Sequence, residues 1–260
     1  MKKFISALLI ILCNTAGAWA QEQVAKTKEV AFKAGEQITY KLRYGFLSAA
    51  ETVIKVEDSP LKFEGRPVLH INAQAKTLGT FNFLFNVRNE YHSYIDPATL
   101  LPYYYWENRK EAKYRHTDKV TFDRQKNIIT ADKGQFSFKG DVFDFLSCYY
   151  YARNIDITGL KVGDVLTLRY FLEDGIHPLT ITYLGKEQTK CNLGTFNCLK
   201  FSPTIIPGRI FKKNSKLYLW ITDDKNRIPV KANVEIVVGS LTMDLTQASG
   251  LKYPLNPVKK

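Results

Sequence analysis

The chain has 260 residues, a formal net charge of +12 at pH 7 and 45% hydrophobic residues. This length suits one large all-β domain or two small ones, and we predict a single domain over residues 21–260. The basic charge would suit lipid phosphates, acidic glycans or another anionic surface, although solubility alone also explains it. Nucleic acid is not an expected partner, because no nucleic-acid-binding motif is present.

The first twenty residues have the organisation of a cleavable signal peptide. Two lysines precede the apolar stretch FISALLIILC, and an A-x-A cleavage site follows at 18–20. A lipoprotein signal at Cys13 is the alternative, but Leu12 stands where such signals have a small residue. No later segment has the roughly 18–20 apolar residues of a membrane helix. We therefore expect a soluble periplasmic protein that begins at Gln21.

From Gly35 onward the sequence alternates apolar and polar residues with the period of a β-strand. In ITYKLRY, residues 38, 40, 42 and 44 share one face. Further strand-like runs follow, separated by turn residues: ETVIKVE, PVLHINAQA, FNFLFNVRNEYHSYI and YYYWENRKE. The first half therefore predicts a meander of roughly six strands.

DVFDFLSCYYYARN breaks this alternation and predicts a helix over about 142–153. Asp141 is the candidate N-cap residue, and Asp144 lies in the first turn, where an acidic residue suits the helix dipole. Apolar and aromatic residues occur around the whole circumference. A helix of this composition is expected to be buried against the sheet.

A second meander follows the helix. The segment VLTLRYFLEDGIHPLTITYL predicts a hairpin around Asp174-Gly175. Further strands are predicted for FNCLKFSP, KLYLWIT, IPVKANVEIVV and SLTMDLTQ. The tail from Gly250 is rich in proline and lysine, and we expect it to leave the sheet.

The two halves carry matching landmarks at spacings of 126 to 129 residues. The matched pairs are Gly35 with Gly163, Gly65 with Gly194, Ile95 with Ile221, and Pro102 with Pro229. We interpret them as an internal duplication with half-repeats of about 35–140 and 163–248. Two such meanders placed edge to edge predict a mainly β fold, a large curved antiparallel sheet or open barrel with the helix filling one side. A two-sheet sandwich is the alternative.

Three cysteines follow the leader: Cys148, Cys191 and Cys198. In CNLGTFNC, a two-residue turn at Gly194-Thr195 would place Cys191 opposite Cys198. An oxidising compartment would then permit a disulfide between them. Two buried thiols are the alternative.

No residue is assigned to catalysis or to a metal, and no cofactor is expected. HExxH and G-x-S-x-G motifs are absent, and the histidines lack metal-binding spacing. Asp223 and Asp224 are the one tempting carboxylate pair, but capping of a loop explains them better. Adjacent residues on a loop seldom flank a glycosidic bond, so a glycan hydrolase is the less favoured alternative.

Two features predict a ligand-binding surface. Tyr103 and Tyr105 share one face of YYYWENRK and would form an aromatic platform, unless this strand is covered on both sides. Four basic residues surround a turn in GRIFKKNSK: Arg209, Lys212, Lys213 and Lys216. This turn is either a solvated loop or a patch for a lipid phosphate or an acidic sugar.

Four segments carry a family resemblance: GEQITYKLRYGFLSAAETVIKV, FDFLSCYYYARN, GTFNCLKFSP and WITDDKNRIPVKANVEIVVGSL. They resemble DUF3108, a family of exported bacterial proteins that is common in Bacteroidetes. Members of the family have no described function, so the resemblance implies no catalytic residue. Cys148 stands where a small apolar residue is usual, which favours packing over chemistry.

These features favour a non-enzymatic periplasmic or envelope-associated protein. We expect it to hold an amphiphile or lipid, with an anionic headgroup, on the concave face of its sheet. The alternative is a scaffold that binds an envelope protein and has no small ligand.

Overall fold

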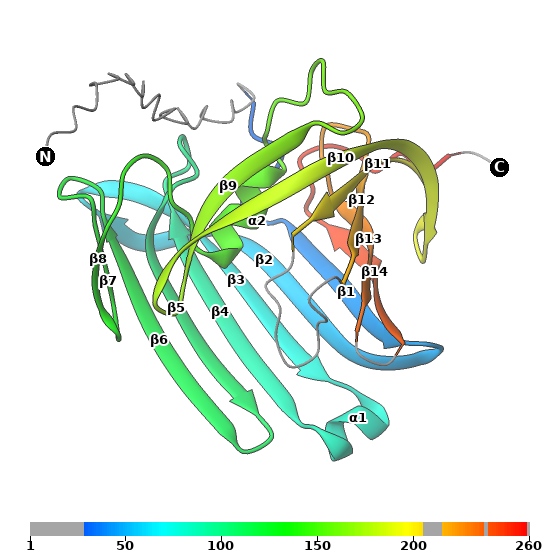
Figure 1. Cartoon of the computed structure of the whole chain (residues 1–260), viewed down its shortest axis with the longest axis horizontal. Helices are drawn as coiled ribbons and strands as arrows, with labels where there is room; N and C mark the ends of the chain where they lie inside the picture. Colours follow the sequence, from blue (N-terminus) through cyan, green and yellow to red (C-terminus); the bar gives the residue numbers. More distant parts are fainter. Residues whose placement is uncertain (1–28, 205–214, 237–238, 259–260) are drawn as a thin grey trace, which may run out of the picture.

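The chain forms one curled antiparallel sheet around a short helix (Figure 1). A computed structural model describes residues 29–204, 215–236 and 239–258. The predicted signal peptide, residues 1–20, lies outside these ranges. The mainly β, open-barrel fold class is confirmed.

Fourteen strands and two helices make up the described part of the chain. Their bounds are β1 (Gln37–Tyr44), β2 (Leu47–Phe63), β3 (Arg66–Thr77), α1 (Gly79–Leu84), β4 (Val87–Ile95), β5 (Pro102–Glu111), β6 (Tyr114–Asp123), β7 (Ile128–Ala131), β8 (Gly134–Ser137), α2 (Phe145–Ala152), β9 (Val165–Leu172), β10 (Gly175–Cys191), β11 (Gly194–Pro203), β12 (Leu217–Thr222), β13 (Pro229–Glu235) and β14 (Ser240–Ser249).

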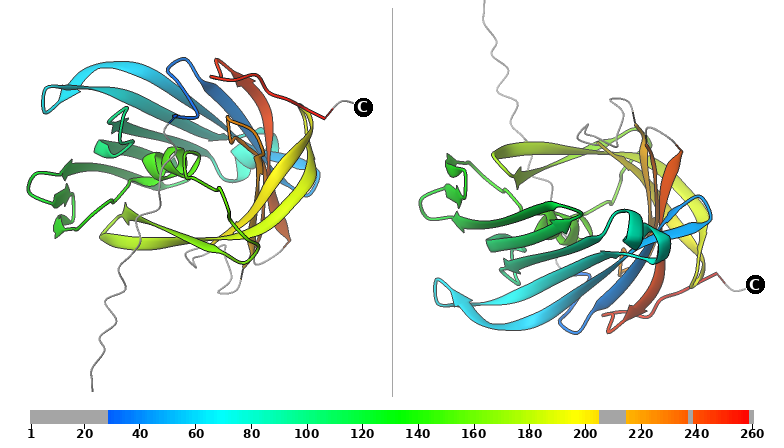
Figure 2. Two further views of the ribbon diagram at one scale, coloured as in Figure 1. Left: turned by 90° about the horizontal axis from the view of Figure 1, so that it is seen from above. Right: turned by 90° about the horizontal axis from the view of Figure 1, so that it is seen from below.

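The two halves of the chain are two meanders that meet at one strand pair. The strand order is β8-β7-β6-β5-β4-β3-β2-β1-β14-β13-β12-β11-β10-β9, so β1 pairs with β14 and the edges are β8 and β9. Figure 2 shows α2 inside the curl of this sheet. Eight strands form the first meander instead of the predicted six.

Helix α1 occupies part of a segment predicted as strand. Gly79 has a φ of +48°, outside the range of an extended chain, and ends the run of β3. The N–H groups of Asn82 and Phe85 then donate to the carbonyls of Leu78 and Phe81, each four residues back, which closes helical turns. The strand β4 begins only at Val87.

Helix α2 begins three residues later than predicted, with Asp144 as its N-cap residue. Asp144 Oδ1 accepts hydrogen bonds from the N–H groups of Leu146 and Ser147 at 2.8 and 2.9 Å. The Ser147 hydroxyl accepts one from the Asp144 N–H in return. The N-cap predicted at Asp141 is wrong because the chain up to Phe143 runs along the edge strand β9.

A buried ion pair joins the end of α2 to both meanders. Arg153 is 2% exposed and Glu36 is 1% exposed. The Arg153 guanidinium donates to the two Glu36 carboxylate oxygens at 2.6 and 3.0 Å, and to the Asn226 carbonyl at 3.2 and 3.0 Å. Glu36 precedes β1 and Asn226 lies between β12 and β13, so one guanidinium connects three distant segments.

The two Asp-to-Pro loops have the same construction. Asp96 Oδ1 accepts hydrogen bonds from the backbone N–H groups two and three residues later, Ala98 and Thr99, both at 2.8 Å. Asp224 Oδ1 does the same at 2.9 and 3.1 Å. The loop-capping role predicted for Asp224 is confirmed, whereas the Asp223 carboxylate pairs with Lys186 at 2.8 Å.

Backbone geometry also recurs at the spacing of the proposed duplication. Gly35 and Gly163 have φ of 90° and 97°, and each donates its N–H to a carbonyl of the long strand β2 or β10, at 2.8 and 2.9 Å. Leu100 and Arg227 have φ of 64° and 49° in the loops before β5 and β13. The duplication stays a prediction, which superposition of the two halves tests.

The hairpin between β10 and β11 does not have the predicted register. Cys191 pairs with Gly194 across a turn at Asn192 and Leu193, and Cys198 lies opposite Glu187. Asn favours such turns, and Gly194 adopts a φ of 130° that suits only glycine. Cys191 and Cys198 are therefore not opposite each other, and both are free, buried thiols.

Candidate functional site

Helix α2 fills only one end of the inner face of the sheet. On β1, Ile38 and Tyr40 are 0% and 2% exposed, and the Tyr40 hydroxyl lies 3.1 Å from that of Tyr149 in α2. Two and four residues farther on, Leu42 and Tyr44 face the same side but are only half-buried. The inner face thus changes from a packed core to a partly open surface along one strand.

The neighbouring strands show the same change. Val230 of β13 and Leu245 of β14 are fully buried, whereas the inner-face residues beyond them are partly exposed. We call the partly exposed set the apolar wall: Leu42, Tyr44, Leu217, Leu219, Ala232, Val234, Leu241 and Met243. Every member is apolar or aromatic, so this end of the inner face presents water with a surface that favours an apolar ligand.

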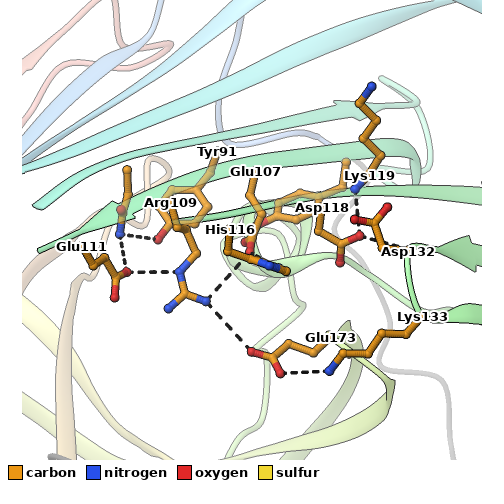
Figure 3. Close-up of polar contacts among 12 residues, drawn as sticks. Tyr91, Glu107, Arg109, Glu111, His116, Asp118, Lys119, Asp132, Lys133 and Glu173 are labelled. Carbon is orange, nitrogen blue, oxygen red and sulfur yellow. Dashed lines mark hydrogen bonds and ion pairs between the residues drawn. The ribbon is translucent and has the colours of Figure 1, made fainter. Parts of the chain in front are cut away.

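Across the interior, β4, β5 and β6 carry polar side chains on their inner face (Figure 3). We call this set the inner polar cluster: Tyr91, Glu107, Arg109, Glu111, His116, Asp118 and Glu173. Glu107 lies opposite Asp118 in the β5–β6 ladder, and Arg109 lies opposite His116. Strand alternation puts the members on β4, β5 and β6 on the same face as the buried Tyr105, and Glu173 reaches them from the β9–β10 turn.

Arg109 links this cluster to the hairpin that follows β9. Its Nε lies 3.1 Å from a Glu111 oxygen, and its terminal nitrogen lies 3.9 Å from Glu107 and 4.0 Å from Glu173. Lys133, in the β7–β8 turn, lies 3.4 Å from the other Glu173 oxygen. Glu173 therefore connects β5 and the β8 edge to the β9 edge, and this network holds the two open edges of the sheet near each other.

Glu107 and Asp118 are the two buried acids of the cluster, at 8% and 6% exposed, and Glu107 has the closer side-chain partners. The Tyr105 hydroxyl donates to it at 2.7 Å, and His116 Nε2 lies 3.6 Å from its other oxygen. Burial raises the pKa of Glu107, and the hydrogen bond from Tyr105 and the Arg109 charge offset this only in part. The cavity beside Glu107 and Asp118 measures about 20 Å³, room for a single water molecule and not for a substrate.

The raised pKa of Glu107 predicts a pH-dependent stability. Between the ordinary value of 4.5 and the raised value, the folded protein binds more protons than the unfolded chain. Glu107 should therefore make the free energy of unfolding fall as pH increases through this range, and Glu107→Gln should remove this contribution to the slope. Urea unfolding of both proteins at pH 4–8 measures it.

Glu111→Gln is the matched control, because Glu111 shifts in the opposite direction. Burial acts to raise its pKa, but hydrogen bonds from Arg109 and Asn89 outweigh burial and lower it. Glu111 therefore stabilises the fold above pH 4.5, and this stabilisation is lost as pH falls through the lowered pKa. Equal pH slopes for the wild type and Glu107→Gln would contradict the assignment.

The structure buries both tyrosines of the predicted platform. Tyr103 and Tyr105 are 7% and 8% exposed, and their hydroxyls donate to Asp96 and Glu107. Neither ring is open to a ligand, because the strand is covered on this side. Lys216 is exposed, and its carbonyl accepts a hydrogen bond from the Glu235 amide. Arg209, Lys212 and Lys213 lie outside the described residues.

Sequence reasoning missed the inner polar cluster, although the signal was present. In YYYWENRKE, the alternation that places Tyr105 inside also places Glu107, Arg109 and Glu111 inside. Charged residues at inward positions are unusual and could have marked the site. The contribution of Glu173 had no such signal, because it comes from a turn far along the chain.

Neither a metal site nor a membrane-spanning helix is found in the part of the chain that the structure describes. No three His, Cys, Asp or Glu residues are arranged to hold a metal ion there. Neither α1 nor α2 has the length and apolarity that crossing a membrane requires. Burial raises the pKa of Cys198 to about 12, so this thiol is protonated near neutral pH and unsuited to nucleophilic chemistry.

Comparison with known proteins identifies the family. The model of the family described as "Protein of unknown function (DUF3108)" matches residues 39–246, from β1 to β14. The chain belongs to the DUF3108 family. The match includes both meanders and α2, so the DUF3108 model describes the whole curled sheet except the ends of the chain. No curated protein matches this DUF3108 member.

Solved structures share the architecture at low sequence identity. A β-barrel-like protein of the DUF1849 family from Brucella abortus aligns with a TM-score of 0.54 and 10% identity, over 86% of this chain and 99% of that one. A proposed exported protein with a YmcC-like fold from Bacteroides fragilis aligns with a TM-score of 0.38 and 12% identity, over 86% and 100% of the chains. The DUF1849 likeness shows that the barrel-like fold occurs outside the DUF3108 family.

Proposed function

We propose that this DUF3108 protein binds an amphiphile in the periplasm, with the apolar chain of the ligand against the apolar wall. The observation that carries the proposal is the change from buried to partly exposed apolar residues along β1, β13 and β14. The sheet curls around α2 at one end and exposes apolar side chains at the other. An apolar ligand could cover these side chains, as α2 covers those at the packed end.

The proposed location and ligand charge rest on the sequence. The first twenty residues have the features of a cleavable signal peptide, and the chain carries 37 Lys and Arg against 25 Asp and Glu. GRIFKKNSK concentrates positive charge directly before β12, one of the strands of the apolar wall. An anionic headgroup would be favoured beside such a sequence.

A non-enzymatic role fits the geometry of the polar side. The acids of the inner polar cluster are engaged with Arg109, Tyr105 and the backbone, and the cavity beside them has room for one water molecule. These carboxylates hold strands and turns together and leave no space for a bond to be cleaved between them. A scaffold without a small ligand remains the alternative outcome of the test below.

The test is a pair of neighbouring substitutions on β14. Leu241→Lys places a charge on the apolar wall, and Thr242→Lys places the same charge on the outer face. Burying a lysine ammonium against an acyl chain is unfavourable. With cis-parinaric acid as the probe, Leu241→Lys should weaken binding at least tenfold, and Thr242→Lys should change it less than twofold.

Mass spectrometry of organic extracts provides the second readout. Protein purified without detergent and then offered envelope lipids should retain lipid in the wild type and in Thr242→Lys. Absence of both retained lipid and probe binding in the folded wild type would contradict the proposal. A stoichiometric protein partner captured by crosslinking in cells, without bound lipid, would favour the scaffold instead.

A further inference from the structure

The end of the sheet away from α2 carries exposed aromatic and aliphatic side chains on two adjacent segments. Phe46 and Leu47, at the β1–β2 turn, are 91% and 45% exposed. Phe83, Leu84 and Phe85, in and just after α1, are 90%, 69% and 52% exposed. Helix α1 has no buried residue, so these side chains contribute nothing to the core.

Hydrogen bonds hold these segments side by side. The Leu78 N–H, at the start of α1, donates to the Ala49 carbonyl of β2 at 2.9 Å. The Ala112 N–H, in the β5–β6 turn, donates to the Asn86 carbonyl after α1 at 2.7 Å. The β1–β2 turn, α1 and the β5–β6 turn thus form one continuous edge, which runs from the bottom to the lower right of Figure 1. We call this edge the aromatic rim.

Basic side chains surround the aromatic rim. The exposed ones are Lys76, Arg88, Lys110, Lys113 and Arg115. The guanidinium groups of Arg88 and Arg115 donate to nearby backbone carbonyls at 2.7 and 2.8 Å. Residues 44–50 and 77–87 contain no acidic residue.

The acids nearest the rim do not cancel this charge. Glu111 accepts hydrogen bonds from Arg109 and Asn89 on the inner face. Glu51 pairs with Lys76 at 3.2 Å, and Glu90 lines the same surface cavity as Lys76 and Arg88. Lys110, Lys113 and Arg115 remain as exposed basic residues beside the rim. Exposed apolar groups ringed by positive charge are the pattern of a surface that binds anionic membranes.

We propose that the aromatic rim docks on the surface of a bilayer that contains anionic lipid. Phe46 and Phe83, the two most exposed rings, would enter the headgroup region, and the flanking lysines and arginines would meet lipid phosphates. Charge complementarity singles out a bilayer as the occupant over a second copy of the chain, whose rim would carry the same positive charge. The proposal stands without amphiphile binding.

Docking would also place the open end of the apolar wall at the membrane. Tyr44 of the wall is two residues from Phe46 of the rim, at the end of β1. The partly exposed inner face and the rim are therefore adjacent along one strand. If the rim is docked, an apolar chain that passes between the bilayer and the apolar wall has a shorter distance to travel through water.

Vesicle binding tests the proposal directly. We expect the full mature chain to bind phosphatidylcholine vesicles that contain phosphatidylglycerol, and to bind pure phosphatidylcholine more weakly. The double variant Phe46→Ser/Phe83→Ser should lower binding to the anionic vesicles at least tenfold. The control Leu61→Ser/Val162→Ser, which removes two exposed apolar side chains outside the rim (49% and 70% exposed), should change it less than twofold.

Charge and self-association are tested on the same samples. Lys113→Glu/Arg115→Glu should lower binding to anionic vesicles, and added salt should weaken wild-type binding. The proposal would be overturned if the wild type does not bind anionic vesicles, or if Phe46→Ser/Phe83→Ser binds them as tightly as the wild type. A dimer that the rim variant loses, without vesicle binding, would overturn it in favour of a second copy. Binding of cis-parinaric acid without vesicles reports separately on the apolar wall.

Discussion

Replacing Arg153 by methionine is expected to lower the free energy of unfolding by about 3–5 kcal/mol, because it leaves the buried Glu36 carboxylate without its partner. The Arg153 and Glu36 side chains are 1% and 0% exposed, so water cannot replace the lost guanidinium. The Asn226 carbonyl would lose both hydrogen bonds from the guanidinium, and the Tyr150 hydroxyl would remain as a hydrogen-bond donor to Glu36. The melting temperature should fall by roughly 6–20 °C, as measured by circular dichroism.

Two controls separate the ion pair from a general effect of losing arginine. Arg115→Met, at an exposed arginine that bonds only backbone carbonyls, should change stability by less than about 0.5 kcal/mol. The double variant Arg153→Met/Glu36→Gln should be more stable than the sum of its single changes predicts, because it no longer buries a lone charge. A loss below about 1 kcal/mol for Arg153→Met would contradict this role for the pair.

Asp144→Ala is expected to destabilise the protein by about 2–4 kcal/mol. The carboxylate caps α2 through two backbone amides and also accepts a 2.6 Å hydrogen bond from the Ser93 hydroxyl of β4. Alanine would leave these donors buried and unsatisfied, and it would detach the start of α2 from the sheet. Urea unfolding followed by tryptophan fluorescence measures the loss.

Asp144→Asn is the matched variant, because asparagine is as good an N-cap residue as aspartate. Its amide oxygen can accept the bonds from Leu146 and Ser147, and its NH2 group can donate to the Ser93 hydroxyl in place of accepting from it. Burial raises the pKa of Asp144, so loss of the charge carries little penalty. Asparagine should therefore retain most of the stability that alanine loses. If asparagine proves as damaging as alanine, hydrogen bonding at this N-cap does not explain the role of Asp144.

The large elements of the fold could be read from local sequence patterns. Alternation in ITYKLRY and its counterparts predicts the strands, and the loss of alternation in DVFDFLSCYYYARN predicts the helix that becomes α2. Two features could not be predicted in this way: a very short helix, and a hairpin whose sequence allows more than one turn. Six-residue α1 contains too little sequence for a helical period, and the register at Cys191 depends on which two residues of CNLGTFNC form the turn.

The site was less predictable, because long-range contacts decide it. Alternation along β5 places Glu107 and Arg109 inside, but only the curl of the sheet brings Glu173 to them. Arg153 and Glu36 are 117 residues apart, and no local pattern indicates that this arginine is buried. The apolar wall likewise depends on where α2 ends inside the curl, which no single strand reveals.

Photocrosslinking with a diazirine-bearing fatty acid tests the central claim most directly. We predict that peptide mapping finds label on the inner-face residues of β1 and β12–β14, with Leu219, Leu241 and Met243 foremost. We also predict that unlabelled fatty acid competes this labelling away. Label confined to the outer face of those strands, such as Trp220 and Thr242, or no competable label at all, would contradict binding at the apolar wall.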